Sequence, residues 1–248
     1  MNKLIMFSGN EYKKLFMQAR TKIILALFVL CALVVGLVSF LINRNTGVQM
    51  IAPGQIPVFV LNLLTGLVLP VLAIFIASEL FAGEFKDGTI KNVFALPVSK
   101  SIIYVGKLLA GAAVIGTCLL ALGISSVVAG VAVNGFEAFG GIGGALVSYL
   151  GAFMYLFVAL VIAGFISLLT DSPGAAIVVN LLIWLGLGLA GTFITAVKGF
   201  LPTNFERWYQ PLMNGVNRTA ALPPLLFMVS YCVVFVVAGM MIFEKKEV

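Results

Sequence analysis

The side chains that could do chemistry in this chain gather in one short polar segment, residues 84–100, between two long apolar runs. Asp87-Gly88 is a turn signal, Thr89 can cap a short helix after it, and Pro97 ends that helix. The apolar face of the predicted helix consists of Ile90, Val93, Phe94 and Leu96. Such a face favours contact with a protein partner; the alternative is an ordinary loop between two apolar helices.

The remaining reactive residues do not form a catalytic or metal-binding set. The chain has no histidine, which removes His-based general bases and most zinc and haem sites. Its two aspartates, Asp87 and Asp171, fall near the ends of apolar runs, so the facing pair of an intramembrane aspartyl protease is missing. Three cysteines (Cys31, Cys118 and Cys232) lie within apolar runs as small hydrophobic side chains. We expect no enzyme activity and no metal site in this chain.

The composition predicts an all-α membrane protein. Of the 248 residues, 62% are hydrophobic and 10% charged, whereas a soluble domain carries about 25% charged residues. Apolar runs of this length cross a bilayer as helices, because helices satisfy the backbone hydrogen bonds in lipid. We expect one transmembrane domain, residues 1–248, with six spans at about 23–42, 57–81, 102–133, 145–169, 174–197 and 221–243.

The positions of the basic residues predict the orientation of the spans. Four of the 15 Lys and Arg residues (Arg44, Lys198, Arg207 and Arg218) lie on one side, which leaves 15 − 4 = 11 on the other. The richer side is cytosolic by the positive-inside rule, so both termini face the cytosol of a bacterial cell membrane. The net charge of +6 is therefore mainly a topology signal, and no basic domain for nucleic acid is visible.

Residues 1–22 are predicted to form an amphipathic helix in the cytoplasmic interface. Asn10 can cap this helix, with Glu11 in its first turn. The alternative is a basic leader without fixed structure. The apolar positions of the predicted helix, at helical spacing, are Tyr12, Leu15, Phe16, Ala19 and Ile23.

The polar segment also carries a family resemblance. Glu84, Gly88-Thr89, residues 96–100 (Leu-Pro-Val-Ser-Lys) and Gly106-Lys107 follow the pattern E-x3-G-T, L-P-V-S-R/K, G-K. This resembles the cytoplasmic signature of type-2 ATP-binding-cassette (ABC) permeases, with Lys100 where arginine is frequent.

The resemblance implies that residues 82–101 form a coupling segment whose helix, residues 88–96, docks on a separate cytosolic ATPase. Glu84, Lys100 and Lys107 become candidates for charge pairs around that joint; alternatively, Lys107 extends to the inner headgroups. The residues assigned to coupling are Glu84, Gly88, Thr89, Ile90, Val93, Phe94, Leu96, Pro97 and Lys100.

The chain carries no nucleotide-binding loop of its own. Around Gly106-Lys107, Ser101 occupies the first glycine position of a Walker A motif and Leu108 follows the lysine. We therefore expect no cofactor in this chain, with ATP and Mg²⁺ bound by the partner ATPase.

Residues 198–220 are predicted to form short helices in the outer part of the membrane. In the resembled family this position holds re-entrant helices that close the outer end of the pathway; the alternative is an aromatic belt anchor. The candidate outer gate residues are Phe205, Trp208 and Tyr209.

The predicted spans contain few polar side chains. No Asp, Glu, Lys or Arg lies near the middle of a span, which disfavours an ion-coupled carrier. Asn62 and Asn180 either line a pathway or form hydrogen bonds between helices. Gly186, Gly188 and Gly191 give the fifth span a small-residue face, for the dimer that the resemblance implies or for packing within one subunit.

These observations predict the permease subunit of an ABC exporter that moves a hydrophobic or amphipathic cargo, such as a peptide toxin or antimicrobial peptide. Its expected partners are the cytosolic ABC ATPase, a second permease subunit and the lipid bilayer. A drug or lipid exporter of the same family is the alternative, and a passive channel or ion-coupled carrier is the alternative from another class.

Overall fold

The computed structural model describes residues 2–49, 51–90, 98–213 and 218–246, and every regular element among them is helical. The prediction of an all-α chain is confirmed for these residues. The elements, with η for 3₁₀ and π turns, are α1 (Asn2–Met17), α2 (Ala19–Thr46), α3 (Ile56–Thr65), α4 (Val68–Ser78), η1 (Glu79–Gly83), α5 (Glu84–Lys86), α7 (Lys100–Asn134), η2 (Gly135–Gly141), α8 (Ile142–Ser167), α9 (Pro173–Phe193), α10 (Thr195–Lys198), η3 (Pro202–Phe205), α11 (Gln210–Met213), η4 (Arg218–Ala221) and α12 (Leu222–Lys245).

Five stretches in the described part of the chain are long and apolar enough to cross a membrane. They are Ala19–Thr46, Val68–Lys86, Lys100–Ser167, Pro173–Phe193 and Thr219–Lys245. The third has 68 residues and contains both α7 and α8. These two helices are antiparallel, since Gly123 faces Tyr149 while the earlier Gly111 faces the later Leu160. A count of six spans stays a prediction.

The second predicted span, residues 57–81, is not one helix. α3 ends at Thr65 and α4 begins at Val68, with Leu67 between them at φ −135° and ψ −50°. Pro70, predicted to kink this span, explains the break, because its ring clashes with the carbonyl of residue 66 in a continuous helix. The π turn η1 and the short helix α5 then carry the chain to Lys86.

The N-terminal helix begins earlier than the cap signal at Asn10 predicts. α1 starts at Asn2 and continues through Asn10 to Met17, where Gln18 in extended conformation separates it from α2. Leu4 and Phe7 pack over Gly106 of α7. This contact holds the first two turns of α1 against the bundle, so packing overrides the local cap.

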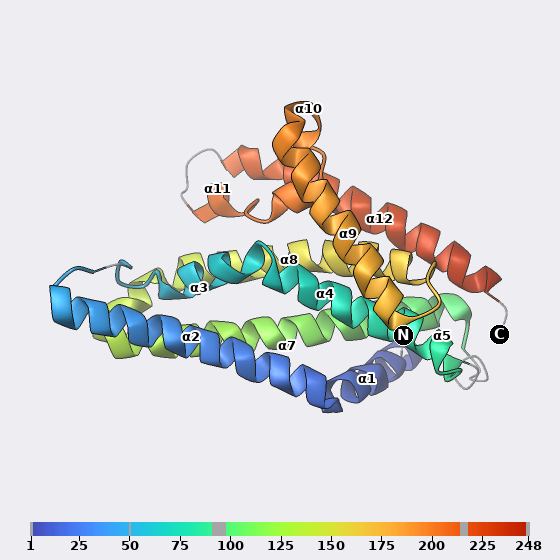
Figure 1. Cartoon of the computed structure of the whole chain (residues 1–248), viewed down its shortest axis with the longest axis horizontal. Helices are drawn as coiled ribbons and strands as arrows, with labels where there is room; N and C mark the ends of the chain where they lie inside the picture. The colour runs from blue at the N-terminus through green and yellow to red at the C-terminus, as the bar shows by residue number, and fades with distance from the viewer. Residues whose placement is uncertain (1, 50, 91–97, 214–217, 247–248) are drawn as a thin grey trace.

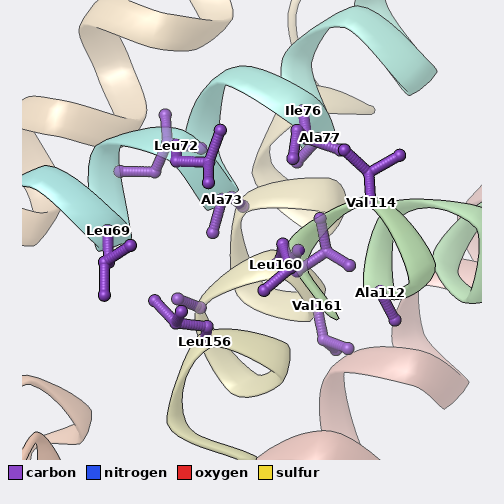
Figure 2. Close-up of a cluster of buried hydrophobic side chains, with 14 of the residues drawn as sticks. Leu69, Leu72, Ala73, Ile76, Ala77, Ala112, Val114, Leu156, Leu160 and Val161 are labelled. Atoms are coloured by element: carbon purple, nitrogen blue, oxygen red, sulfur yellow. The ribbon is translucent and has the colours of Figure 1, made fainter. Parts of the chain in front are cut away.

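The core lies where α4, α7 and α8 meet. Figure 2 shows side chains of the three helices converging on one another, and none of those that it labels is more than 6% exposed. In Figure 1, α7 and α8 run along the long axis, and α1, α5 and the last turn of α12 lie at the same end. We call this the inner end. The labelled core residues are Leu69, Leu72, Ala73, Ile76, Ala77, Ala112, Val114, Leu156, Leu160 and Val161.

Three long helices surround this core with largely unburied surfaces. Only 22% of the most apolar window is buried in α2 and in α9, and 11% in α12. α9 crosses the bundle obliquely, whereas α2 runs beside α7 (Figure 1). Their apolar faces are therefore available to lipid or to another protein.

Candidate functional site

Four charged side chains from three elements meet at the inner end. Glu84 lies at the centre: its Oε1 is 2.6 Å from Lys14 Nζ, and its Oε2 is 2.5 Å from Lys107 Nζ. Lys107 Nζ is also 3.6 Å from Glu11 Oε2. We call Glu11, Lys14, Glu84 and Lys107 the inner charge cluster. The Lys107 side chain is 0% exposed, so the reading in which it extends to the headgroups is wrong.

Local backbone features bring these four side chains together. Glu84 follows directly on the π turn Glu79–Gly83, and a π turn shifts the side chains after it relative to a regular α-helix. Lys107 follows Gly106, where a Cβ would lie 2.6 Å from Phe7 Cδ1. The glycine therefore allows α1 to approach α7 closely enough for the α1 side chains to reach Lys107.

The inner charge cluster balances two carboxylates against two ammonium groups. A buried charge is costly unless it is paired, and both buried groups of the central pair, Glu84 and Lys107, have partners. Partial burial alone would lower the pKa of Lys14, but its hydrogen bond to Glu84 and the Glu84 charge outweigh this and raise that pKa. Lys14 is thus charged at neutral pH, and the cluster clamps α1, α5 and α7 together.

A second set of contacts ties the start of α7 to the end of α12. Lys100 Nζ donates hydrogen bonds to the backbone oxygens of Glu244, at 3.0 Å, and Lys246, at 2.9 Å. Ser101 Oγ donates to the Glu244 carboxylate. The Lys246 ammonium lies 4.1 Å from the centre of the Phe85 ring, a cation–π distance. Both ends of the predicted coupling segment are therefore anchored in the bundle.

The predicted coupling helix is described only at its start. Gly88 has φ +67°, a left-handed conformation that favours glycine, in agreement with the predicted turn. Thr89 belongs to that turn and Ile90 is buried, with 1% exposure. The other predicted coupling residues, Val93, Phe94, Leu96 and Pro97, lie outside the described residues.

The predicted outer gate residues pack into the bundle. Phe205 stacks on Phe227 of α12 with centroids 6.1 Å apart, and the Trp208 indole N–H donates to the Gly151 carbonyl at 3.0 Å. The Tyr209 hydroxyl donates to Asn62 Oδ1 at 3.3 Å. Burial is the main reason that the pKa of Tyr209 is raised to about 12, so this hydroxyl is neutral at pH 7.

The candidate residues of the fifth predicted span, now in α9, differ in whether they contact the rest of this chain. Asn180 is 3% exposed and donates to Ser167 Oγ at 3.2 Å, so it joins α9 to α8 within this chain. Gly191 packs against Asn204. At Gly186 and Gly188, by contrast, a Cβ would meet no atom within 4 Å in the described part of the chain. Gly186 therefore lies on an open face of α9, whereas Gly188, two residues later and so on another side of the helix, borders a cavity with Trp184.

Sequence reasoning missed two members of the inner charge cluster. The sequence predicts Glu11 only as a charge in the first turn of a helix, and Lys14 is one of the basic residues that are counted only for the orientation of the spans. Their spacing of three residues puts them on one side of a helix, which was the available signal. Among the described residues, no group of three or more His, Cys, Asp or Glu side chains could hold a metal ion.

Comparison with protein families identifies a matching family. A family model described as "ABC-2 family transporter protein" matches residues 10–188, which include the inner charge cluster and the predicted coupling segment. No curated protein matches the chain.

Proposed function

The chain belongs to the ABC-2 family of transporter proteins, and from this premise we propose that it is the membrane subunit of an ATP-driven exporter. A separate cytosolic ATPase binds ATP and Mg²⁺, and this subunit provides the path through a bacterial cell membrane. In the proposed topology α2, α3–α4, α7, α8, α9 and α12 form six spans, and both termini are cytosolic.

The observation that carries this proposal is the inner charge cluster. It fixes Glu84, at the start of segment 82–101, to Lys107 on α7 and Lys14 on α1. A force applied to residues 88–96 by a closing ATPase would therefore pass directly into α4 on one side and α7 on the other. Because α7 is 35 residues long and packs on α2, α3 and α8, its movement would reach the outer end of the bundle.

The outer segment supports a gated exit. Residues 202–209 fold back so that Trp208 contacts Gly151, inside α8, and Tyr209 contacts Asn62, inside α3. We propose that residues 198–220 form a re-entrant segment, and that its displacement opens the path to the outside. A pathway with few charged groups suits a hydrophobic or amphipathic cargo, for which we propose a peptide; a drug or lipid is the alternative cargo.

Loss of the coupling segment is expected to abolish ATPase binding. Deleting residues 89–95, or replacing Gly88 by Pro, should eliminate both co-purification with the partner cytosolic ATPase and ATP-driven export. Proline requires φ near −65°, which the Gly88 turn at φ +67° cannot provide.

The matched control for Gly88→Pro is Gly135→Pro. Gly135 also has a positive φ, +59°, and open space around it, but it lies in the η2 connection at the far end of α7. Its variant should still bind the ATPase. A complex that survives deletion of residues 89–95 and still exports cargo would exclude the proposed coupling role.

The open face of α9 is proposed to contact a second permease subunit, together with α2. Gly186→Leu should weaken the permease dimer by at least about ten-fold, because a large side chain prevents close helix contact at a small-residue face. The measurement is cross-linking in native membranes at graded expression levels. Gly143→Leu, at an equally open position in α8, is the control and should leave the dimer unchanged. Equal dimer yields for both variants would exclude Gly186 from the interface.

A further inference from the structure

A cavity with an apolar wall and a few polar side chains lies beside the break between α3 and α4, away from the inner charge cluster. Its volume is about 320 Å³, within the usual range of small-ligand sites. α8 contributes Tyr155, α9 contributes Trp184, and the outer segment contributes Thr203, Asn204 and Glu206. We call this the outer cavity.

The carboxylate of Glu206 gives the outer cavity its charge. Glu206 Oε1 is 3.4 Å from Arg207 Nε, whereas Oε2 faces Gly66, where a Cβ would lie 3.6 Å away. The side chain is 29% exposed. Arg207 therefore occupies one carboxylate oxygen and the second can accept from another donor.

Two aromatic rings form the wall of the same cavity. The rings of Tyr155 and Trp184 have centroids 6.1 Å apart, inclined at 57°, and the two residues are 2% and 6% exposed. Aromatic faces attract cations, tryptophan most strongly. Thr203 Oγ1 is buried and has no hydrogen-bond partner in the described part of the chain, so an acceptor in the lining is unused.

We propose that the outer cavity binds a primary ammonium group attached to an apolar chain. Glu206 Oε2 would accept from the ammonium, Thr203 Oγ1 would accept a second hydrogen bond, and the aromatic pair would contact the charge and the first methylenes. An anion is disfavoured as the ligand, because the negative charge of the Glu206 carboxylate would repel it. A metal ion would find a single carboxylate in this lining, and among the described residues no group of three or more His, Cys, Asp or Glu side chains could hold one.

Two sources could supply this ammonium chemistry: the headgroup of phosphatidylethanolamine, or a free cationic amphiphile such as a basic peptide. If the ligand is a free cationic amphiphile, the outer cavity is part of the route that the cargo takes. This assignment to the cargo route rests on the proposed function. Binding itself depends only on the residues described above and can be measured without an ATPase.

The fluorescence of Trp184 provides the test. The chain has two tryptophans, so Trp208→Phe leaves Trp184 as the single reporter. In phosphatidylcholine nanodiscs, octylammonium should change its emission saturably, and octanol and octanoate should bind at least about ten-fold more weakly, as a lost charge-assisted hydrogen bond predicts. Glu206→Gln should weaken octylammonium binding by a similar factor. The control, Glu137→Gln, removes an exposed carboxylate from η2 and should change nothing.

Calorimetric titration of the chain with Trp208 intact repeats the measurement if Trp208→Phe does not fold. Competition by added phosphatidylethanolamine would identify a lipid as the ligand, and octylammonium binding unaffected by that lipid would identify a free amphiphile. The proposal is overturned if Glu206→Gln binds octylammonium as tightly as the unmodified chain, or if octanol binds equally well. Loss of ATPase binding in other variants would not affect either result.

Discussion

Glu84→Gln is expected to destabilise the protein by about 3 kcal/mol, the cost of leaving a buried charge without its partner. Lys107 is 0% exposed, and after this change its nearest carboxylate oxygen would belong to Glu11, at 3.6 Å. Thermal unfolding of the purified protein in detergent would measure the loss. The expected result is a clearly lower midpoint together with a lower yield of folded protein.

Glu79→Gln is the matched control. Glu79 also pairs at 2.6 Å, with Arg20, but the Arg20 side chain is 66% exposed. Such a pair contributes less than about 1 kcal/mol, so this variant should unfold close to the parent temperature. Equal midpoints for Glu84→Gln and Glu79→Gln would show that the inner charge cluster is not a buried clamp.

The double variant Glu84→Gln/Lys107→Met separates stability from coupling. Removing both charges avoids the unpaired ammonium, so much of the lost stability should return. If the charges also transmit force from the ATPase, this stable variant should still bind the ATPase but export poorly. Normal export by the double variant would limit the cluster to a structural role.

The long helices were predictable because lipid leaves an apolar run few conformations. The predicted span 102–133 became α7 at Lys100–Asn134, and 145–169 became α8 at Ile142–Ser167. A kink at Pro70 was predicted, but the complete break at Leu67 into two helices was not, because a run of apolar residues through Pro70 gives the same hydropathy whether or not the helix is continuous. The π turn before Glu84 likewise depends on packing and leaves no signal in hydropathy.

Only those residues of the candidate site that belong to a linear sequence motif could be predicted. Glu84 and Lys107 are separated by 22 residues, and the permease-like pattern identified both as charge-pair candidates. Lys14 and Glu11 join them only because α1 packs over Gly106, which is a property of the folded chain. Glu206 was not identified for the same reason: its place beside Gly66 requires the outer segment to fold back into the bundle.

Gly141→Ala is expected to destabilise the outer end of the bundle by about 1–3 kcal/mol or more, the usual cost of overpacking. A Cβ at this position would overlap the carbonyl oxygen and carbon of Gly54, and both are backbone atoms that no rotamer change can move. The contact is equally tight from the other side, since a Cβ on Gly54 would lie 2.6 Å from the backbone N of Gly141. Thermal unfolding would measure the effect.

The neighbouring Gly140→Ala is the control for this contact. A Cβ at Gly140 would meet no other part of the described chain within 4 Å, so the same change one residue earlier should alter stability by less than about 0.5 kcal/mol. A difference between the two variants would therefore report the contact between η2 and the loop before α3. If both variants unfold at the parent temperature, Gly54 and Gly141 do not touch in the folded protein. The outer ends of α3, α7 and α8 would then not be held together by this contact. The proposed exit, closed by residues 198–220, needs these ends to be firmly joined, so that result would count against it.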